Sequence, residues 1–319
     1  MKITVIIPTY RRPHDLPRLF DSLDKQISAP EEILILVGPN DSESLAISRN
    51  WAKNNSVVRV FEAQKPSVVH SINLGLSKAS NEIICLIDDD VWLPPDWSTK
   101  IRTAFETNKN LGAFGGRDHL QNLAPYLSNP PLARFVGIFR LHTHEGNHHR
   151  GAVKSPIKIH VVKGVNLSFR RSLLIPLQIE PALEGQGAET CWEMDLCLRI
   201  MHTGSDIIYD NNNYVLHYTS PRLGFDNRKD VFSPAWPKRL FNESLIYAKF
   251  RPLLELYIWA LRLFLIGTQV QPGILWSLLL IRKAGWRVLT LPWRNTIFIL
   301  QGALFGLRHR LPPKKHLLN

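Results

Sequence analysis

Short apolar runs alternate with amphipathic segments through the first 120 residues of the chain. Ile3–Pro8, Ile33–Val37 and Glu82–Asp88 are rich in β-branched and aliphatic residues, which is typical of buried strands. Between the first two runs, apolar side chains recur at helical spacing from Leu16 to Leu23. Because strands that alternate with helices usually pair in parallel, this part of the chain predicts an α/β fold with a doubly wound sheet.

The middle of the chain has a weaker pattern. Residues 120–151 predict loops, and residues 157–174 predict a strand followed by a turn. An amphipathic stretch from Thr190 predicts a helix that stops at Gly204, because glycine often follows a helix C-terminus. Two short strands are expected at residues 206–210 and 214–219. We therefore expect residues 1–225 to form one α/β domain with a mixed sheet.

A different pattern begins after Trp236. The stretches at residues 245–267, 273–291 and 295–311 are helical and strongly apolar, and each contains Lys or Arg. No uninterrupted apolar stretch approaches the roughly 18 residues that suggest a transmembrane helix. Residues 226–319 are therefore expected to form a C-terminal extension of basic, apolar helices.

The positive charge is also concentrated in this C-terminal part of the chain. The formal net charge is +12, and from Lys238 onward thirteen Lys and Arg stand against only Glu243 and Glu255. A basic, apolar region with several tryptophans is typical of a segment that lies on an anionic membrane surface. A nucleic-acid surface would not need so much Leu, Ile and Trp, so no nucleic-acid partner is expected. A helical subdomain packed on the core, or a homodimer interface, is the alternative.

Composition limits the class of protein. Apolar residues make up 45% and charged residues 21%, which favours a globular chain over a disordered one. The apolar run before Pro8 has five residues and predicts a strand rather than a signal peptide. The three cysteines, Cys85, Cys191 and Cys197, lack paired zinc spacing, so we expect buried, reduced thiols in a cytosolic protein.

Three carboxylates, Asp88, Asp89 and Asp90, follow one of the predicted strands directly. At about 5 Å and an effective dielectric constant near 20, each pair repels by roughly 3 kcal/mol. The triplet therefore predicts a compensating cation, and hard divalent cations prefer carboxylate oxygens. Ligands of open α/β sheets also bind at the carboxyl ends of strands. The alternative is a helix N-terminus near Asp96, for which a single aspartate would suffice.

Five motifs share one order along about 215 residues: VIIPTYRR, SINLGLSKASNEIICLIDDDVWLPPDW, GVNLSFRRSLL, WEMDLCLRIMHTG and YVLHYT. This arrangement resembles the inverting family 2 glycosyltransferases. The resemblance covers the nucleotide-recognition opening, the Asn-x-Gly helix, the Asp-x-Asp motif, the acceptor loop, the catalytic helix and the histidine that often follows. It implies a GT-A fold and a sugar donor activated by a nucleoside diphosphate.

The resemblance also implies roles for individual residues. The metal, Mn²⁺ or Mg²⁺, would be held by Asp88, Asp90 and His217. The acceptor, a glycan or a sugar on a polyprenyl or other lipid, would meet Gly164, Asn166 and Trp192. The donor would be contacted by Pro8, Thr9, Tyr10, Asp41, Asn73, Asp88 and Asp89. As a lone histidine in a strand, His217 is equally explained by packing.

The catalytic helix departs from the family pattern. Its usual Glu-Asp start reads Trp192 and Glu193 here, so the resemblance gives Glu193 the position of the base, with Asp195 as second candidate. A helix capping box from Thr190 to Glu193 would also explain that glutamate. Asp195 would then merely pair with Arg199, one turn further along the helix.

Other motifs are altered or absent. The family's Asp-Asp-Gly-Ser is replaced by LVGPNDSES, which leaves Asp41 as the nearest base-recognising carboxylate, and Ile72 replaces the arginine before Asn73. These motifs therefore do not specify the nucleotide. The Gln-x-x-Arg-Trp motif of processive synthases is missing, which favours transfer of a single sugar. The histidines His142, His144, His148 and His149 predict a solvent-exposed loop over the acceptor site rather than a metal site.

Together these features predict a glycosyltransferase of polysaccharide biosynthesis that is peripheral on the cytoplasmic face of a membrane. Two other classes of protein fit parts of the pattern. A metal-dependent phosphohydrolase could use the same aspartates, but it would release free sugar or phosphate without an acceptor. A nucleotide-sugar-binding protein would bind the donor without turnover.

Overall fold

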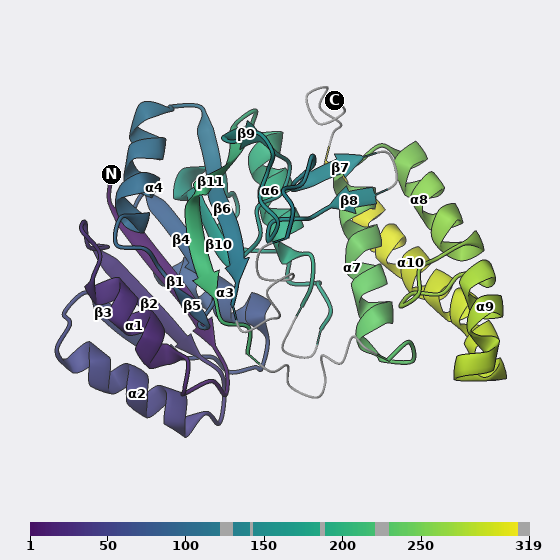
Figure 1. The fold of residues 1–319 in the computed structure, drawn as a ribbon, viewed down its shortest axis with the longest axis horizontal. Coiled ribbons are helices and arrows are strands. Elements are labelled where there is room, and N and C mark those ends of the chain that lie inside the picture. Colours follow the sequence, from purple (N-terminus) through teal and green to yellow (C-terminus); the bar gives the residue numbers. More distant parts are fainter. Residues whose placement is uncertain (122–129, 141–142, 186–188, 221–229, 312–319) are drawn as a thin grey trace. The chain divides into compact units, whose positions relative to one another are not determined.

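The computed structural model describes residues 1–121, 130–140, 143–185, 189–220 and 230–311 (Figure 1). It divides into two compact units. The first comprises residues 1–138, 145–181 and 196–221, and the second comprises residues 139–144, 182–195 and 222–319. The second unit therefore includes the segment with Glu193 as well as the C-terminal helices. The expected boundary at residue 225 lies outside the described residues.

A nine-stranded mixed sheet forms the first unit, with the spatial order β3-β2-β1-β4-β10-β6-β11-β5 and with β9 paired to β11. The parallel part consists of β1 (Ile3–Thr9), β2 (Glu32–Val37), β3 (Val58–Glu62) and β4 (Ile83–Ile87). The rest consists of β5 (Val91–Trp92), β6 (Leu111–Leu120), β9 (Ile157–Lys158), β10 (Asn166–Arg170) and β11 (Asp206–His217). Strand β10 runs antiparallel between β4 and β6, which makes the sheet mixed, as expected.

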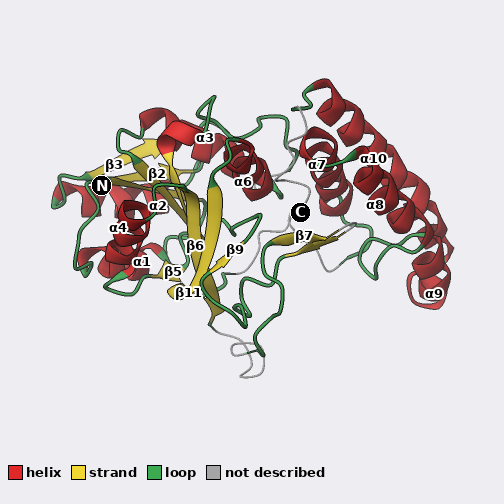
Figure 2. Ribbon diagram, turned by 90° about the horizontal axis from the view of Figure 1, so that it is seen from above, coloured by secondary structure: helices red, strands yellow, loops and turns green. Residues whose placement is uncertain are grey.

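Helices cover both faces of this sheet (Figure 2). Ile3, Val5 and Ile7 point to one face, where they join a core with residues of α1 (Leu16–Asp24) and α4 (Trp97–Thr107), flanked by α2 (Ser42–Lys53). Ile6 faces the opposite side, where it touches Gly75 of α3 (Val68–Lys78). This two-sided burial explains why the strands read as continuous apolar runs.

Three predictions for the middle of the chain need correction. The structure has strand β6 at residues 111–120, where no strand was expected. The glycines of this segment hide the strand pattern in the sequence. Residues expected to be loops also include β7 (Ile138–Arg140) and β8 (Thr143–Glu145), which pair with each other. The two short strands expected at residues 206–219 are one strand, β11, with a register shift between Asp210 and Val215. Helix α6 (Trp192–His202) and the short helix η1 (Arg171–Leu173) complete this region.

Helices dominate the second unit: α7 (Ala235–Phe250), α8 (Leu253–Leu265), α9 (Ile274–Ala284), η3 (Trp286–Thr290) and α10 (Leu291–Arg308). The helix expected from residue 245 is broken by Pro252, which separates α7 from α8. Helix α10 packs closely on α7, where an added Cβ at Gly302 would lie 2.2 Å from the carbonyl oxygen of Phe241. None of the helices in the described part of the chain combines the length and hydrophobicity needed to cross a bilayer.

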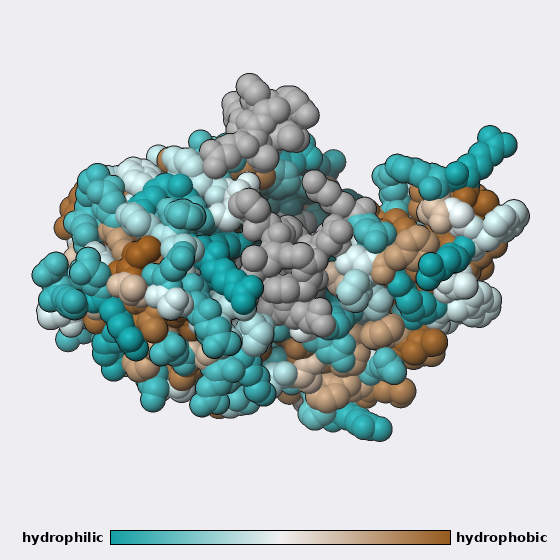
Figure 3. Space-filling model, turned by 90° about the horizontal axis from the view of Figure 1, so that it is seen from below, coloured by the Kyte–Doolittle hydropathy of each residue, from teal (hydrophilic) through white to brown (hydrophobic). Residues whose placement is uncertain are grey.

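Large apolar side chains are exposed mainly in this unit. Of the 21 such side chains among the described residues, 17 lie between Leu253 and Leu307. Figure 3 shows hydrophobic side chains gathered over these helices on the face in view. The cysteines Cys85, Cys191 and Cys197 are free and buried, as expected.

Candidate active site

The carboxylate triplet lies at the carboxyl edge of the sheet, directly after β4. Strand β5 continues from the triplet and pairs antiparallel with the end of β11, where His217 lies opposite Val91. The backbone N–H of Tyr218 donates to the carbonyl oxygen of Asp90 at 2.8 Å. This pairing brings His217 next to Asp90, although 127 positions separate them in the chain.

Asp88, Asp90 and His217 form a cluster that fits a divalent cation. Their potential ligand atoms all lie within 4.8 Å of one another. Asp90 Oδ1 is buried and accepts no hydrogen bond, although His217 Nε2 lies 3.1 Å away. Two carboxylates provide the oxygen ligands that Mg²⁺ and Mn²⁺ prefer, and the imidazole nitrogen favours a transition ion such as Mn²⁺. The three residues expected to hold the metal are therefore brought together.

Arg12, the last residue of the VIIPTYRR motif, was given no role by sequence analysis, and it neutralises part of the triplet. Its Nη1 lies 2.8 Å from Asp89 Oδ1 and 3.1 Å from Asp90 Oδ2. The backbone N–H of Ser220 donates to the same Asp90 oxygen at 3.1 Å. Asp89 therefore faces an internal cation, whereas Asp88 and the other oxygen of Asp90 face His217. This division explains how the fold tolerates three adjacent carboxylates.

The three carboxyl groups differ in pKa. Burial and the negative charge of Asp90 raise the pKa of Asp88 to about 7. Burial also raises the pKa of Asp89, to about 6, although Arg12 opposes this effect. The pKa of Asp90 is lowered despite its burial, because His217 and Arg12 stabilise its charge. Without a cation, Asp88 is therefore only partly ionised at neutral pH.

His217 is held from its other side by Asp118, which sequence analysis also missed. Asp118 Oδ1 lies 2.8 Å from His217 Nδ1, and Lys163 Nζ donates to Asp118 Oδ2. Burial alone would lower the pKa of His217, but the hydrogen bond that it donates to Asp118 and the nearby Asp90 carboxylate raise it to about 10. At neutral pH this imidazole carries a proton that a metal ion would have to displace.

These pKa shifts predict how Mn²⁺ affinity depends on pH. Binding displaces one proton from His217 below pH 10 and a second from Asp88 below pH 7. The association constant should therefore rise about tenfold per pH unit between pH 7 and 8, and more steeply between pH 6 and 7. Titrations of the protein with Mn²⁺ at pH 6, 7 and 8 measure this slope. An affinity that stays constant over this range would contradict the proposed ligand set.

The loop after β1 reaches the same edge of the sheet. Thr9 is buried, Tyr10 is half-buried, and the Tyr10 ring packs so closely on Gly38 that an added Cβ there would lie 2.3 Å from it. Asp41, the expected base-recognising carboxylate, caps helix α2 by accepting from the Ser44 N–H at 3.2 Å. Its other oxygen accepts from the backbone N–H of Arg11. Asp41 thus uses both oxygens to hold this loop and the start of α2.

Two asparagines of the motifs, Asn73 and Asn166, form side-chain hydrogen bonds within the fold. Asn73 exchanges two hydrogen bonds with the backbone of Ile179, at 2.6 and 3.0 Å. Asn166 is fully buried, accepts from Trp97 Nε1 at 3.0 Å and donates to the carbonyl oxygen of Asn213 at 2.6 Å. The structure thus shows both side chains bonded to the fold, and their expected contacts with donor and acceptor stay predictions. Gly164 lies in the turn before β10.

The first turn of α6 contains Trp192, Glu193 and Asp195. Cys191, directly before the helix, has a non-helical φ of 70°, and its carbonyl oxygen accepts from the Asp195 N–H at 3.3 Å, so it occupies the capping position. A capping box that starts at Thr190 does not fit this helix start. The pKa of the Arg239 guanidinium in α7 is raised mainly by the negative charge of Glu243, and Glu193 makes a smaller contribution.

The expected pair between Asp195 and Arg199 is wrong. Asp195 is fully buried and lies 3.0 Å from Lys249 Nζ of α7, and Arg199 donates instead to the carbonyl oxygens of Pro176 and Gln178. A long-range ion pair therefore replaces the local one. Because its carboxylate is buried against Lys249, Asp195 is a weaker candidate for the base than Glu193.

The histidine-rich segment is not simply an exposed loop. His148 is buried, its Nε2 lies 2.8 Å from the carbonyl oxygen of Val161, and burial lowers its pKa to about 4. His144 and His149 are half-buried, and His142 lies outside the described residues. The expectation of solvent exposure is therefore wrong for His148, whose ring is part of the core.

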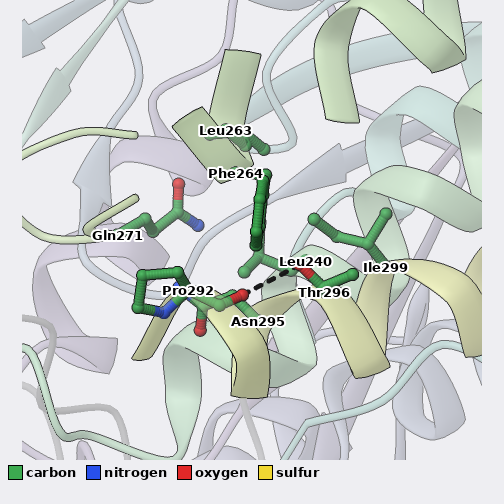
Figure 4. A pocket seen from close by; sticks show the side chains of 8 residues that line it. All are labelled: Leu240, Leu263, Phe264, Gln271, Pro292, Asn295, Thr296 and Ile299. Atoms are coloured by element: carbon green, nitrogen blue, oxygen red, sulfur yellow. Dashed lines mark hydrogen bonds between the residues drawn. The ribbon is translucent and has the colours of Figure 1, made fainter. Parts of the chain in front are cut away.

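A small hollow lies within the second unit. It encloses about 200 Å³ of empty space, part of it open to solvent, and is lined by Leu240, Leu263, Phe264, Gln271, Pro292, Asn295, Thr296 and Ile299 (Figure 4). The lining contains no titratable side chain. The hydroxyl of Thr296 is used inside its own helix, where it donates to the carbonyl oxygen of Pro292 at 2.9 Å.

Comparisons with known proteins show the family of this chain. The family model described as glycosyl transferase family 2 matches residues 4–177. A glucosyl-dolichyl phosphate glucuronosyltransferase of Haloferax volcanii is 24% identical over 224 residues, which cover 68% of this chain and 69% of the relative.

Solved structures with 14–15% identity show the fold. The mannosyltransferase PcManGT of Pyrobaculum calidifontis, in complex with GDP-Man and Mn²⁺, superposes with a TM-score of 0.55, covering 96% of this chain and 87% of that one. Residues 1–349 of S. aureus TarS, in complex with UDP-GlcNAc, give a TM-score of 0.58 and coverage of 97% and 90%. The predicted GT-A fold is thus confirmed. Since the family model covers more than half of the chain, this protein belongs to glycosyl transferase family 2, the inverting glycosyltransferases that use nucleotide sugars.

Proposed function

We propose that the protein transfers a single sugar, with inversion, from a nucleoside-diphosphate sugar to a lipid-linked glycan at a membrane surface. The observation that carries this proposal is the cluster of Asp88, Asp90 and His217 at the carboxyl edge of a family 2 sheet. Two carboxylates and an imidazole, placed where ligands of open sheets bind, suit a cation that holds a diphosphate.

The reaction is a displacement at the anomeric carbon. An acceptor hydroxyl oxygen attacks that carbon, its proton passes to the Glu193 carboxylate, and the bond to the donor's phosphate oxygen breaks. A bound Mn²⁺ or Mg²⁺ supplies Lewis-acid stabilisation of the diphosphate that leaves. Asp88 and Asp90 hold the cation, and Arg12 keeps Asp89 and Asp90 in place through its ion pairs.

The donor would be recognised mainly by the loop that follows β1. Pro8, Thr9 and Tyr10 lie at the carboxyl edge next to the strand that precedes the triplet. Tyr10 presents a half-buried ring, which suits stacking on a nucleobase. Asp88 is the partly exposed carboxylate of the triplet and suits a contact with the sugar or ribose. Asp41 acts indirectly, by holding the loop.

The acceptor assignment rests on a relative and on the C-terminal helices. The Haloferax volcanii relative is named for a glucosyl-dolichyl phosphate acceptor, which is a lipid-linked sugar. Each of three helices exposes one apolar stripe at helical spacing. These stripes comprise Leu254, Ile258, Leu261 and Leu265 of α8; Ile274, Leu275, Leu278 and Leu279 of α9; and Trp293, Ile297, Leu300, Leu304 and Leu307 of α10. Such stripes suit helices that lie in the membrane interface.

Basic side chains border these stripes. Arg282, Lys283 and Arg287 are exposed at and after the end of α9, and Arg308 is exposed at the end of α10. Trp286, 75% exposed, lies among them and is the side chain that favours the membrane interface. Each basic residue near an anionic lipid surface contributes about 1 kcal/mol of attraction. We therefore propose peripheral attachment to an anionic membrane.

Liposome flotation tests the attachment. The full-length protein should float with anionic vesicles, less so with neutral ones, and binding should weaken as salt screens the basic residues. Replacing both Leu278 and Leu279, 54% and 64% exposed, by Glu should reduce vesicle partitioning at least about tenfold. Ile27→Glu, at a site 74% exposed in the first unit, is the control. If the double variant floated as well as the wild type, the stripes would not be the attachment surface.

A transfer assay tests the function as a whole. The protein is incubated with Mn²⁺, a panel of UDP- and GDP-sugars and vesicles that contain a polyprenyl-phosphate-linked sugar, and the lipids are analysed by mass spectrometry and NMR. The proposal predicts one added sugar with inverted anomeric configuration. Free sugar released equally fast without acceptor would indicate a phosphohydrolase. Donor binding without any turnover would indicate a binding protein.

A further inference from the structure

One fully buried carboxylate beside the candidate active site belongs to none of the motifs. Asp118, in β6, contacts His217 Nδ1 at 2.8 Å with Oδ1 and accepts from Lys163 Nζ with Oδ2. Its backbone N–H donates to the carbonyl oxygen of His148 at 3.2 Å. Both carboxylate oxygens therefore have a defined partner, and one of those partners is a candidate metal ligand.

The sheet is built so that Asp118 and His217 meet. Strands β6 and β11 lie side by side in Figure 1, and they run parallel with Asp118 opposite Val215, two residues before His217. The register shift after Asp210 sets this alignment. Gly116 permits the shift, because a Cβ at this position would lie 1.6 Å from the carbonyl oxygen of Asn213. Such irregularities re-aim side chains beside active sites.

The contact fixes which imidazole nitrogen faces the triplet. With Nδ1 on Asp118, Nε2 is directed to Asp90 Oδ1, 3.1 Å away. Nδ1 must then donate, so Nε2 is the nitrogen that is left to bind a cation. An anionic partner also makes the imidazole a stronger ligand. A purely structural ion pair with Lys163 would not require the carboxylate to touch His217.

We propose that Asp118 is a positioning residue that holds His217 with Nε2 toward the cation, and that Lys163 keeps this carboxylate oriented. The inference rests on the cation site of the proposed function and deepens it. Asp118 does not itself touch the cation or the donor. Its effect should therefore appear first in the affinity for the metal alone.

Mn²⁺ titration followed by electron paramagnetic resonance tests the inference on the full-length protein. Asp118→Asn keeps the shape and an oxygen acceptor for Nδ1–H but removes the charge, and we expect about tenfold weaker Mn²⁺ binding. Asp118→Ala also removes the acceptor, and we expect about 100-fold weaker binding. Asp206→Asn is the matched control, because Asp206 pairs with Lys158 at 2.9 Å in the same sheet, away from His217. Its Mn²⁺ affinity should equal that of the wild type.

The outcomes separate the inference from the proposed function. A graded loss from wild type to Asn to Ala supports a positioning role, since a merely structural role would lower the melting temperature without changing Mn²⁺ affinity. If Asp118→Ala does not fold, the shape-preserving Asp118→Asn decides alone. Wild-type affinity in Asp118→Asn overturns this inference and leaves the proposed function intact. No Mn²⁺ binding by the wild type overturns both the inference and the cation site.

Discussion

Asp90→Asn should lower the rate of sugar transfer at least about 1,000-fold, because several kcal/mol of leaving-group stabilisation depend on the cation. Asp90 lies close to three other groups of the site. One of its oxygens meets Arg12 and the Ser220 N–H, and the other faces His217. Replacing the carboxylate by an amide keeps the shape but places a neutral group among them. Initial rates with saturating donor and Mn²⁺ measure the loss.

Asp96→Asn is the matched control for this variant. Asp96 is a carboxylate six residues further along the chain, and it pairs with Lys100 at 2.9 Å on the surface. Its replacement should change the transfer rate by less than about twofold, since exposed ion pairs contribute little. If Asp90→Asn retained more than a tenth of the wild-type rate, the triplet would not be the cation site.

Glu193→Gln should lower the transfer rate by about 100- to 10,000-fold, because the amide cannot take the proton of the acceptor hydroxyl. Donor and Mn²⁺ affinities should remain close to those of the wild type, since Glu193 is proposed to act on the acceptor. Measuring the transfer rate and the donor affinity on the same preparation separates lost chemistry from lost binding.

Asp195→Asn distinguishes the two candidate bases. Asp195 is buried against Lys249, so its replacement leaves that lysine without its buried anionic partner at 3.0 Å and should mainly lower the melting temperature. Lost turnover in Asp195→Asn at unchanged stability, together with normal turnover in Glu193→Gln, would reverse the assignment.

The strands and the triplet could be predicted from the sequence because both are local features. Strands β1, β2 and β4 are continuous apolar runs, and the aspartates directly follow the last of them. Strand β6 was missed because its glycines Gly112, Gly115 and Gly116 read as breaks. Each allows close contact with a neighbouring segment, and at Gly116 this neighbour is the backbone of β11.

The partners of the site residues could not be predicted, because the sheet order brings them together. Arg12 reaches Asp89 across 77 positions, and Asp118 reaches His217 across 99. No local spacing indicates either pair. A buried carboxylate in a strand is nonetheless a signal, since Asp118 could be tolerated inside the sheet only with charged partners.

Three polar residues that were expected to contact ligands also have partners in the fold that the sequence did not indicate. Asp41 caps helix α2, Asn73 bonds to the backbone of Ile179, and Asn166 bonds to Trp97 in the core. A residue can belong to a motif because it holds the backbone of a site, and not only because it contacts a ligand. The exposed apolar stripes of α8 to α10, in contrast, follow directly from the helical spacing of their leucines and isoleucines.

The most direct test of the central claim is a calorimetric titration of the protein with UDP and GDP, in the presence and absence of Mn²⁺. If Asp88, Asp90 and His217 hold a cation against a diphosphate, one nucleotide should bind at least about tenfold more tightly with Mn²⁺, and Asp90→Asn should abolish this difference. Equal affinity with and without the ion, or an Mn²⁺ effect that persists in Asp90→Asn, would contradict the assignment of these residues to a metal–diphosphate site.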